Sequence, residues 1–222
     1  MSINIVYEDN SIIIAEKEAG VAAQSADPAQ PDCVSLIKEH IRKNSPEKNE
    51  EPYLGIVHRL DQPVAGLLVF AKDRQAAAEL SRQVQNGLMN KHYRAMVEGI
   101  VDASEEKILT DRLYKDSRNS RTVIASAAPE GYKLQEAVLK YRTEKILEDR
   151  NMTILSITLV TGRFHQIRAQ LSHMGNPIAG DRKYGAVSSY PKGIALVADR
   201  LEFIHPRSGE KVEKIVDFSF AL

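Results

Sequence analysis

Three short polar stretches carry the side chains of this chain that could do chemistry. They read HRLD at 58–61, KHYRA at 91–95 and TGRFHQIRAQL at 161–171. Each lies beside an apolar run that is typical of a β-strand, so the fold could bring them together. They would then supply a carboxylate from Asp61, a phenol from Tyr93 and a guanidinium from Arg168. Such a set is sufficient for nucleophilic catalysis with electrostatic control of charge, so the pattern indicates a polar reaction site.

Each of these residues also has a structural interpretation. Asp61 could cap a turn or helix, Tyr93 could be a core residue with its hydroxyl at the rim, and Arg168 could belong to a structural ion pair. His58 and His165 could be structural histidines whose ring nitrogens are hydrogen-bonded. Spacing alone leaves both interpretations open.

Other reaction classes lack support in the sequence. The six histidines are scattered without the spacing of metal ligands, so we expect no metal site. A serine hydrolase would need a Gly-x-Ser-x-Gly motif, and nucleotide chemistry would need a phosphate-binding glycine loop, and the chain contains neither. The site is therefore expected to work without a metal.

The start of the chain and its single cysteine indicate in which cellular compartment the protein is expected. The first residues, MSINIVYEDN, are acidic where a secretory leader would be basic, and no segment resembles a membrane span. Cys33 alone cannot form an internal disulfide, which agrees with a reducing compartment. We expect a cytoplasmic protein.

The elements that must position the polar stretches are mostly strands. Strands are expected on both sides of the turns at 8–10, 148–151 and 207–209, and over 66–72 and 91–98. Helices are expected over 33–42, 74–86 and 164–175. Because the strands mostly neighbour one another, we expect an α+β fold with a mixed, mainly antiparallel β-sheet core and flanking helices and loops. The 222 residues, 43% of them hydrophobic, could form one large core or two smaller ones.

Charge is balanced overall but uneven along the chain. A formal net charge of +0 argues against indiscriminate binding to phosphates. Between Gly162 and Gly185, however, four basic residues stand against one acidic residue, and the segment 111–133 carries five basic residues. This segment is expected to form a surface hairpin or loop. The alternative for both regions is a solvent-exposed charged surface without a binding role.

Together with the residues around them, the three stretches resemble a known protein family. HRLDQPVAGLLVFAKD, KHYRAMVEG and TGRFHQIRAQLSHMGNPIAGDRKYG, in this order, are similar to the RluA-type family of RNA pseudouridine synthases. IVYEDNSIIIAEKEAG and LEFIHPRSGE resemble that family's first and last strands. The resemblance implies an isomerase that detaches uracil from C1′ of a uridine in RNA, turns the base and rejoins it through C5. It implies no cofactor, metal or redox partner.

The resemblance also implies roles for individual residues. Asp61 matches the catalytic carboxylate, which either attacks C1′ or takes the 2′ proton. Tyr93 matches the tyrosine that stacks on the target base and is placed to help remove the C5 proton. Arg168 matches the arginine that pairs with the aspartate, offsetting the desolvation that would otherwise raise the pKa of the carboxyl. Arg59 matches the arginine that fills the stack vacated when the base is extruded.

Recognition of RNA is expected to come from the catalytic domain itself. The first expected strand begins almost at Met1, so we expect 1–222 to form a single pseudouridine synthase catalytic domain without a separate N-terminal RNA-binding domain. A local basic surface on a neutral protein predicts a steep dependence of binding on salt. The expected RNA-binding residues are His58, Arg59, Arg112, Arg118, Arg121, Arg163, His165, Arg182 and Lys183.

The chain departs from the family's pattern at five positions. A lysine-proline pair usually stands at 17–18, a threonine-serine pair at 64–65, and a histidine at 170 and at 197. This chain has Glu18, Val64, Ala65, Gln170 and Val197 there. The departures bear on substrate and rate, whereas the three residues expected to be catalytic are intact.

Two hypotheses follow from the resemblance. The first is an active RNA pseudouridine synthase that modifies ribosomal or transfer RNA, and thereby takes part in rRNA or tRNA processing. The second is an RNA-binding or folding-assistance protein on the same scaffold with weak or no catalysis, because Val64 and Ala65 lack hydroxyls that could brace the aspartate loop. In either case we expect a monomer that binds RNA, without DNA or membrane partners.

Overall fold

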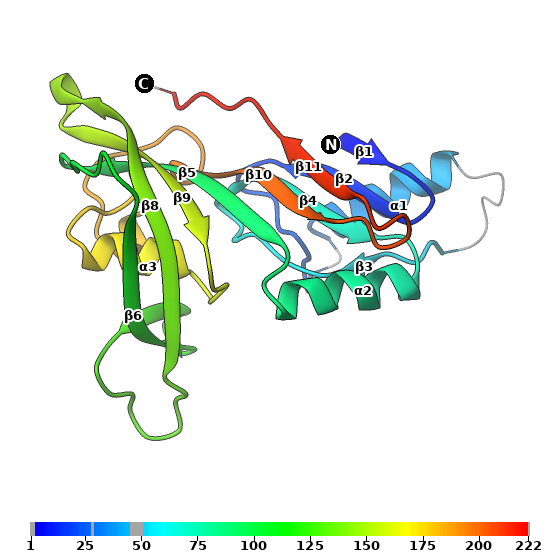
Figure 1. Cartoon of the computed structure of the whole chain (residues 1–222), viewed down its shortest axis with the longest axis horizontal. Helices are drawn as coiled ribbons and strands as arrows, with labels where there is room; N and C mark the ends of the chain where they lie inside the picture. The colour runs from blue at the N-terminus through cyan, green and yellow to red at the C-terminus, as the bar shows by residue number, and fades with distance from the viewer. Residues whose placement is uncertain (1–2, 28, 45–50, 222) are drawn as a thin grey trace. The chain divides into compact units, whose positions relative to one another are not determined.

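The described part of the chain groups into two compact units. The computed structural model describes residues 3–27, 29–44 and 51–221 (Figure 1). Unit 1 comprises Met1–Lys91 with Ala198–Phe218, and unit 2 comprises His92–Val197 with Ser219–Leu222. Of the two possibilities that the sequence left open, two smaller cores fit this grouping. The single catalytic domain over 1–222 stays a prediction.

Unit 1 is a sheet with two helices. Its elements are β1 (Asn4–Glu8), β2 (Ile12–Lys17), α1 (Cys33–Asn44), β3 (Gly55–Ile56), β4 (Ala65–Ala71), α2 (Arg74–Gln85), the larger part of β10 (Leu196–Ile204), and β11 (Lys211–Ile215). The strands follow the order β1-β2-β4-β10, with β3 paired to β4 and β11 paired to β10. The pairs β1–β2, β2–β4, β3–β4 and β10–β11 are antiparallel.

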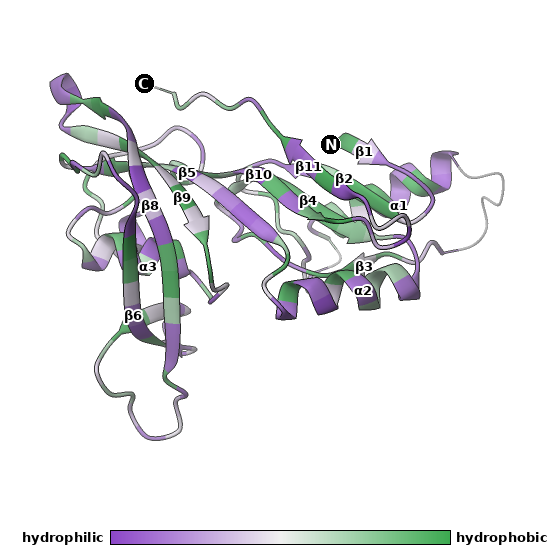
Figure 2. Ribbon diagram, in the orientation of Figure 1, coloured by the Kyte–Doolittle hydropathy of each residue, from purple (hydrophilic) through white to green (hydrophobic). Residues whose placement is uncertain are grey.

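The core of unit 1 lies around its two central strands, β2 and β4. The runs Ile12–Ala15 and Leu67–Ala71 are buried, as expected for strands covered on both faces. The helix α2 adds Ala76 and Leu80 to the same apolar cluster. Its first turn is capped by the Asp73 carboxylate, which accepts the backbone N–H of Ala76 at 2.9 Å. Figure 2 shows hydrophobic residues in these strands and a more hydrophilic surface along α2.

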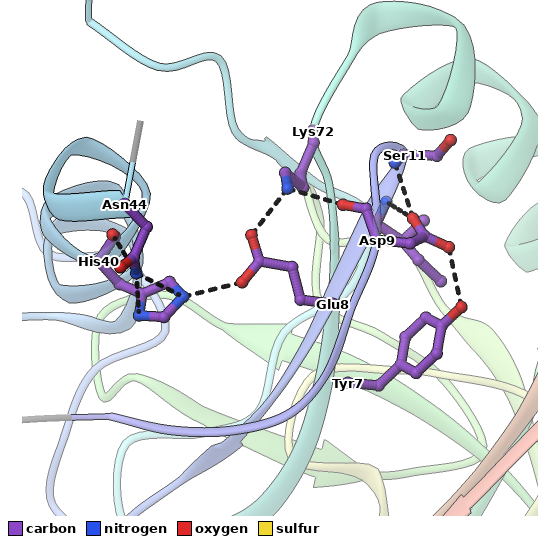
Figure 3. A network of polar contacts seen from close by, with 8 residues as sticks. Tyr7, Glu8, Asp9, Ser11, His40, Asn44 and Lys72 are labelled. Carbon is purple, nitrogen blue, oxygen red and sulfur yellow. Dashed lines mark hydrogen bonds and ion pairs between the residues drawn. The ribbon is translucent and has the colours of Figure 1, made fainter. Parts of the chain in front are cut away.

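A network of polar side chains fixes one end of the β2–β4 pair (Figure 3). The Asp9 carboxylate accepts two backbone N–H groups of the turn between β1 and β2, at 2.7 and 2.9 Å. Lys72, which follows β4, donates to the Glu8 carboxylate at 2.7 Å and to the Asp9 carbonyl at 2.6 Å. His40 of α1 lies 2.8 Å from the same Glu8 carboxylate. Lys17 lies at the opposite end of the β2–β4 pair.

Unit 2 is built from long antiparallel strands and one helix. Its elements are most of β5 (Asn90–Glu98), β6 (Lys107–Asp116), β7 (Arg121–Ile124), β8 (Gln135–Leu147), the 3₁₀ turn η1 (Glu148–Arg150), β9 (Met152–Leu159), α3 (Gln166–His173) and the 3₁₀ turn η2 (Arg182–Tyr184). The strands follow the order β5-β9-β8-β6-β7, and the pairs β6–β7, β6–β8 and β8–β9 are antiparallel. The helix α3 lies against β7 and η2.

The expected fold is confirmed, with one helix shorter than predicted. The structure is a mixed sheet with few helices, and the basic segment 111–133 contains the β6–β7 hairpin. The helix expected over 164–175 covers only Gln166–His173. It starts late because His165 has φ 49°, a left-handed conformation that a helical residue cannot adopt. No helix in the described part of the chain is long and apolar enough to cross a membrane.

Candidate active site

Asp61 lies on a tight turn that leads into β4 in unit 1. Its backbone carbonyl accepts the N–H of Val64 at 3.0 Å, and Leu60 and Val64 on either side of the turn are buried. The Asp61 side chain itself is half-buried, whereas Arg59 is exposed. The sequence HRLDQPV thus forms a turn anchored at both ends by apolar residues, with its charged side chains between the anchors.

A glycine fixes the start of β4 behind this turn. Gly66 has φ 125°, and a Cβ at this position would lie 2.2 Å from the carbonyl oxygen of Ala198 in β10. No other residue fits this approach without moving the backbone. The distance from the aspartate turn to the neighbouring strand is therefore set by the backbone.

Lys17 is hydrogen-bonded to the turn that carries Asp61. This side chain at the end of β2 is only 1% exposed, and its ammonium donates to the carbonyls of Glu18, Val21 and Gln62 at 3.0, 2.7 and 2.9 Å. Burial lowers the pKa of Lys17 to about 8, whereas Cys33 and Asp61 act in the opposite direction. Lys17 was missed as a site residue from the sequence, although it matches the lysine of the family's lysine-proline pair at 17–18.

His58 braces the start of the same turn. It follows β3, and its Nε2 accepts the backbone N–H of Val69 in β4 at 3.2 Å, so Nδ1 carries the ring proton. The pKa of His58 is lowered to about 3 by burial and, to a smaller extent, by the charge of Lys91. His58 is therefore neutral. Its Nε2 is hydrogen-bonded, whereas Nδ1 is buried without a hydrogen-bond partner among the described residues, so the structural interpretation is met only in part. The RNA contact expected for it stays a prediction.

In unit 2, Arg168 is held by a buried ion pair. Its Nε and Nη2 donate to the two carboxylate oxygens of Asp181 at 2.6 and 2.9 Å, and both side chains are buried. The ring of Tyr184 lies 5.0 Å from the guanidinium carbon. This fork geometry fixes the plane of the guanidinium. The structural ion pair considered for Arg168 thus exists, and Asp181, which supplies it, was missed as a site residue from the sequence.

Tyr93 and Gln170 occupy buried positions in unit 2. Tyr93 of β5 is 6% exposed, as expected for a core residue with its hydroxyl at the rim. Gln170 of α3 donates to the carboxylate of Asp111 in β6 at 2.8 Å and accepts from the side chain of Gln166 at 2.9 Å. The departure from the family's histidine is therefore part of a satisfied buried network.

His165 belongs to an aromatic cluster at the start of α3. The Tyr184 hydroxyl accepts the backbone N–H of Thr122 at 2.7 Å, which leaves its proton for Nδ1 of His165 at 3.0 Å. Phe164 stacks on the imidazole ring with 3.8 Å between the ring centroids. Burial, followed by the charges of Arg168 and two lysines, lowers the pKa of His165 to about 3. The imidazole is neutral and fixed in one orientation.

Basic side chains surround this aromatic cluster. Lys115 lies 4.7 Å from the Phe164 ring, and Arg121 lies 5.6 Å from the Tyr184 ring. Lys183 of η2 donates to the carbonyl of Ser120 in the β6–β7 hairpin at 3.2 Å. We call Lys115, Arg121 and Lys183 the basic cluster of unit 2. The structure thus brings together residues of the two basic segments, both of which were expected to contribute to one basic surface.

The other expected RNA-binding residues lie outside the basic cluster of unit 2. Arg112 and Arg118 are exposed on the β6–β7 hairpin, and Arg182 is exposed on η2. Arg163 donates through Nε to the carbonyl of Glu136 at 3.0 Å. Arg59 belongs to unit 1. Within the described ranges, no group of three or more His, Cys, Asp or Glu side chains could hold a metal ion.

Comparison with known proteins identifies the family. Residues 11–173 match the family model described as RNA pseudouridylate synthase. The chain is 35% identical over 219 residues to a protein of Aquifex aeolicus named an uncharacterized RNA pseudouridine synthase, covering 94% of this chain and 67% of that protein. It is 34% identical over 232 residues to the ribosomal large subunit pseudouridine synthase D of Neisseria meningitidis serogroup B, covering 96% of this chain and 57% of that protein. The chain thus spans roughly 57–67% of these relatives' length.

Solved structures share the fold. Human RNA pseudouridylate synthase domain containing 4 superposes with a TM-score of 0.76 at 17% identity, covering 97% of this chain and 88% of that chain. Human RNA pseudouridylate synthase domain containing 1 gives a TM-score of 0.76 at 22% identity, covering 98% and 84%. This likeness confirms the expected fold, and the family model covers Asp61, Tyr93 and Arg168. The chain belongs to the RNA pseudouridylate synthase family, as the RluA-type resemblance of its motifs predicted.

Proposed function

We propose that this chain isomerises uridine to pseudouridine in RNA. The observation that carries the proposal is the family match over 11–173, a range that includes all three polar stretches. The turn that carries Asp61 and the ion pair of Arg168 support it, because a hydrogen bond fixes the backbone at Asp61 and two hydrogen bonds fix the guanidinium of Arg168. Preorganised charge is what an isomerase of this kind needs.

The reaction breaks the bond from C1′ to N1 of uracil, forms a bond from C1′ to C5, releases the C5 proton and places a proton on N1. We assign Asp61 as the carboxylate that either attacks C1′ or takes the 2′ proton. Tyr93 stacks on the base and assists removal of the C5 proton, and Arg168 offsets the charge of the aspartate.

The target uridine must leave its stack to react. Extruding a base costs about a few kcal/mol, which the remaining RNA contacts must offset. Arg59 is exposed beside the aspartate turn, and a planar guanidinium can fill the vacated stack. The basic cluster of unit 2 is suited to bind phosphates, and its aromatic neighbours favour the same surface.

The preferred substrate class is ribosomal RNA. Relatives named for the ribosomal large subunit support this choice, and transfer RNA is the alternative. We further propose that the protein acts as a monomer in the cytoplasm without a cofactor. DNA and membranes are not proposed as partners.

An RNA-binding protein without catalysis is the second candidate. Val64 and Ala65, which replace two hydroxyl residues of the family's pattern, favour it. In the structure Val64 is buried at 2% exposure, and the turn is held instead by Lys17 and by backbone hydrogen bonds. These contacts support the turn that carries Asp61 without the two hydroxyls, which favours the first candidate.

Mapping of pseudouridines in total RNA tests the proposal. A strain that lacks this gene would be complemented with the wild type or with Asp61→Asn, and carbodiimide-modified RNA would be mapped by reverse transcription. We expect one or a few sites to disappear in the deletion strain and to return only with the wild type. Identical maps in all strains, under conditions in which the protein is made, would support the second candidate instead.

A further inference from the structure

An exposed aromatic ring lies directly before α3 in unit 2. Phe164 is 37% exposed, whereas Tyr184 in the same aromatic cluster is only 4% exposed. Single hydrophobic side chains are common on protein surfaces, and most of them have no binding role. Phe164 differs from such a scattered residue because its ring is held in a fixed position and lies among basic side chains.

Contacts to the backbone and to the ring fix the position of Phe164. The side-chain hydroxyl of Thr122 in β7 donates to the Phe164 carbonyl. The imidazole of His165 stacks on one face of the Phe164 ring, with 3.8 Å between the centroids and 20° between the planes. The imidazole is in turn hydrogen-bonded to the Tyr184 hydroxyl at 3.0 Å. The orientation of the second ring face is therefore set by the protein itself.

The second face of the Phe164 ring carries a flexible cation. The Lys115 ammonium lies over the ring, 4.7 Å from its centroid. Because the imidazole of His165 already occupies one face at 3.8 Å, the ammonium lies on the other face. Lys115 is an exposed residue of β6, and its long side chain can turn away from the ring without disturbing the core. The second face is therefore covered by a group that a ligand can displace.

An unpaired nucleobase suits this ring face better than the ammonium does. A planar base covers the whole ring and removes apolar surface from water, so stacking contributes more to binding than an exposed cation–π contact. The displaced ammonium of Lys115 can then bind a phosphate of the same strand. Arg121 and Lys183, the other members of the basic cluster of unit 2, add positive charge beside the same rings. Aromatic faces next to basic side chains are typical of surfaces that bind single-stranded RNA.

We propose that Phe164 is a stacking platform for an unpaired base of the RNA substrate, and that Lys115 covers this platform in the free protein and binds a phosphate in the complex. This role of Phe164 rests on the proposed function. It narrows the substrate class to RNA that offers an unpaired nucleotide in addition to the one that reacts. A base inside a duplex is stacked between its neighbours and cannot reach the ring.

The chain contains no tryptophan, so a single indole can report on the platform. Phe164→Trp keeps an aromatic face at this position and adds a fluorescent group. Oligouridine should quench the indole fluorescence by stacking on it, whereas the same strand annealed to oligoadenylate should not. Tyr53→Trp is the matched control, because Tyr53 is an aromatic residue of unit 1 with a similar exposure of 42%. Its fluorescence should be unchanged by either RNA.

Affinity for fluorescein-labelled oligouridine separates stacking from charge. Phe164→Leu keeps an apolar side chain without an aromatic face, so it should weaken binding about tenfold and leave the slope of log affinity against log salt unchanged. Phe164→Trp should bind as tightly as the wild type. Lys115→Met removes one phosphate contact and should reduce the slope by about 0.7, the value for single strands. Lys107→Met, an exposed lysine at the other end of β6, is its control and should change neither quantity.

NMR of labelled phenylalanine rings tests the same contact in the wild-type chain. The chain has five phenylalanines, and Phe164→Leu identifies the signal of Phe164. Oligouridine should move this signal upfield, as expected for a ring beneath a stacked base, and should leave the signals of the buried Phe70 and Phe203 in place.

None of these measurements depends on turnover. A wild type that forms no pseudouridine in any RNA would end the proposed function, yet quenching, affinity and ring signals would still decide whether Phe164 stacks on RNA. Failure of the wild type to bind oligouridine would overturn the inference. So would the absence of quenching in Phe164→Trp, an unmoved Phe164 signal, or equal affinity of Phe164→Leu and the wild type.

Discussion

The two units hold their buried cations in opposite ways. In unit 1 the Lys17 ammonium is surrounded by three neutral carbonyls, and burial lowers its pKa to about 8. In unit 2 the Arg168 guanidinium meets the Asp181 carboxylate in a two-pronged ion pair. A formal counter-charge stabilises the second cation, whereas hydrogen bonds to neutral carbonyls hold the first. The difference predicts that the free energy of unfolding depends more on the counter-charge in unit 2 than on the cation in unit 1.

The largest effect should come from breaking the ion pair of unit 2. Asp181→Asn keeps the shape of the side chain and removes its charge, so a buried guanidinium loses its compensating carboxylate. We expect the free energy of unfolding to fall by about 3 kcal/mol in urea denaturation. Lys17→Met should change it by less than about 1 kcal/mol, because relief of desolvation offsets the lost hydrogen bonds.

The control for this comparison is an exposed ion pair. Glu79 and Arg82 pair at 2.7 Å on the surface of α2. Glu79→Gln should leave the midpoint of urea unfolding almost unchanged, because an exposed ion pair contributes little to stability. If Lys17→Met destabilised the protein as much as Asp181→Asn, the two cations would contribute equally to stability and the contrast between the units would be wrong.

An effect of intermediate size is expected on stability at acidic pH, where a buried histidine in each unit should lower the free energy of unfolding in the same way. His58 in unit 1 and His165 in unit 2 both have a pKa lowered to about 3, mainly by burial. The unfolded chain binds these protons first, near pH 6.5, so stability that is present above pH 6.5 is lost as the pH falls towards 3. Each histidine should remove about 1–2 kcal/mol between pH 6.5 and 5.

Urea unfolding at pH 7 and pH 5 measures this loss. His58→Gln and His165→Gln should each remove one part of the pH dependence, because glutamine can still accept a hydrogen bond but does not titrate in this range. If the double variant kept the full loss between pH 7 and pH 5, other groups would be responsible and neither histidine would be the buried neutral form inferred from the structure.

The smallest effect should appear in RNA binding by unit 2. Arg121→Ala removes one member of the basic cluster and should weaken RNA affinity about fivefold, or about 1 kcal/mol. The slope of log affinity against log salt should decrease by about one, as expected for one phosphate contact. Arg150→Ala, at the exposed turn between β8 and β9, serves as the control and should change neither quantity. If the two variants had the same RNA affinity and the same salt dependence, the basic cluster would not be part of the RNA-binding surface.

Local patterns in the sequence were sufficient for most of the fold. The α2 helix was predictable because Asp73 caps its first turn and Gly87 follows its end. The basic hairpin was predictable from its polar composition. The first turn of the third helix was placed wrongly because the left-handed conformation of His165 depends on packing against Tyr184, 19 residues away.

The contacts that organise the candidate site were not visible in the sequence. Lys17 and Gln62 are separated by 45 residues, and Thr122 and Tyr184 by 62. Such pairs are fixed by the pairing of strands and the packing of loops, which no local pattern encodes. The family motifs indicated which residues matter, whereas the structure supplied the partners that hold them.

The most direct test of the proposed reaction is tritium release from RNA that carries uridine labelled at C5. Isomerisation breaks the C5–H bond, so each conversion releases one tritium into water. We predict release by the wild type and none above background by Asp61→Asn, with equal RNA binding by the two proteins. Release by Asp61→Asn at a rate near that of the wild type would contradict the role of Asp61, and no release by the wild type from ribosomal or transfer RNA would contradict the proposed function itself.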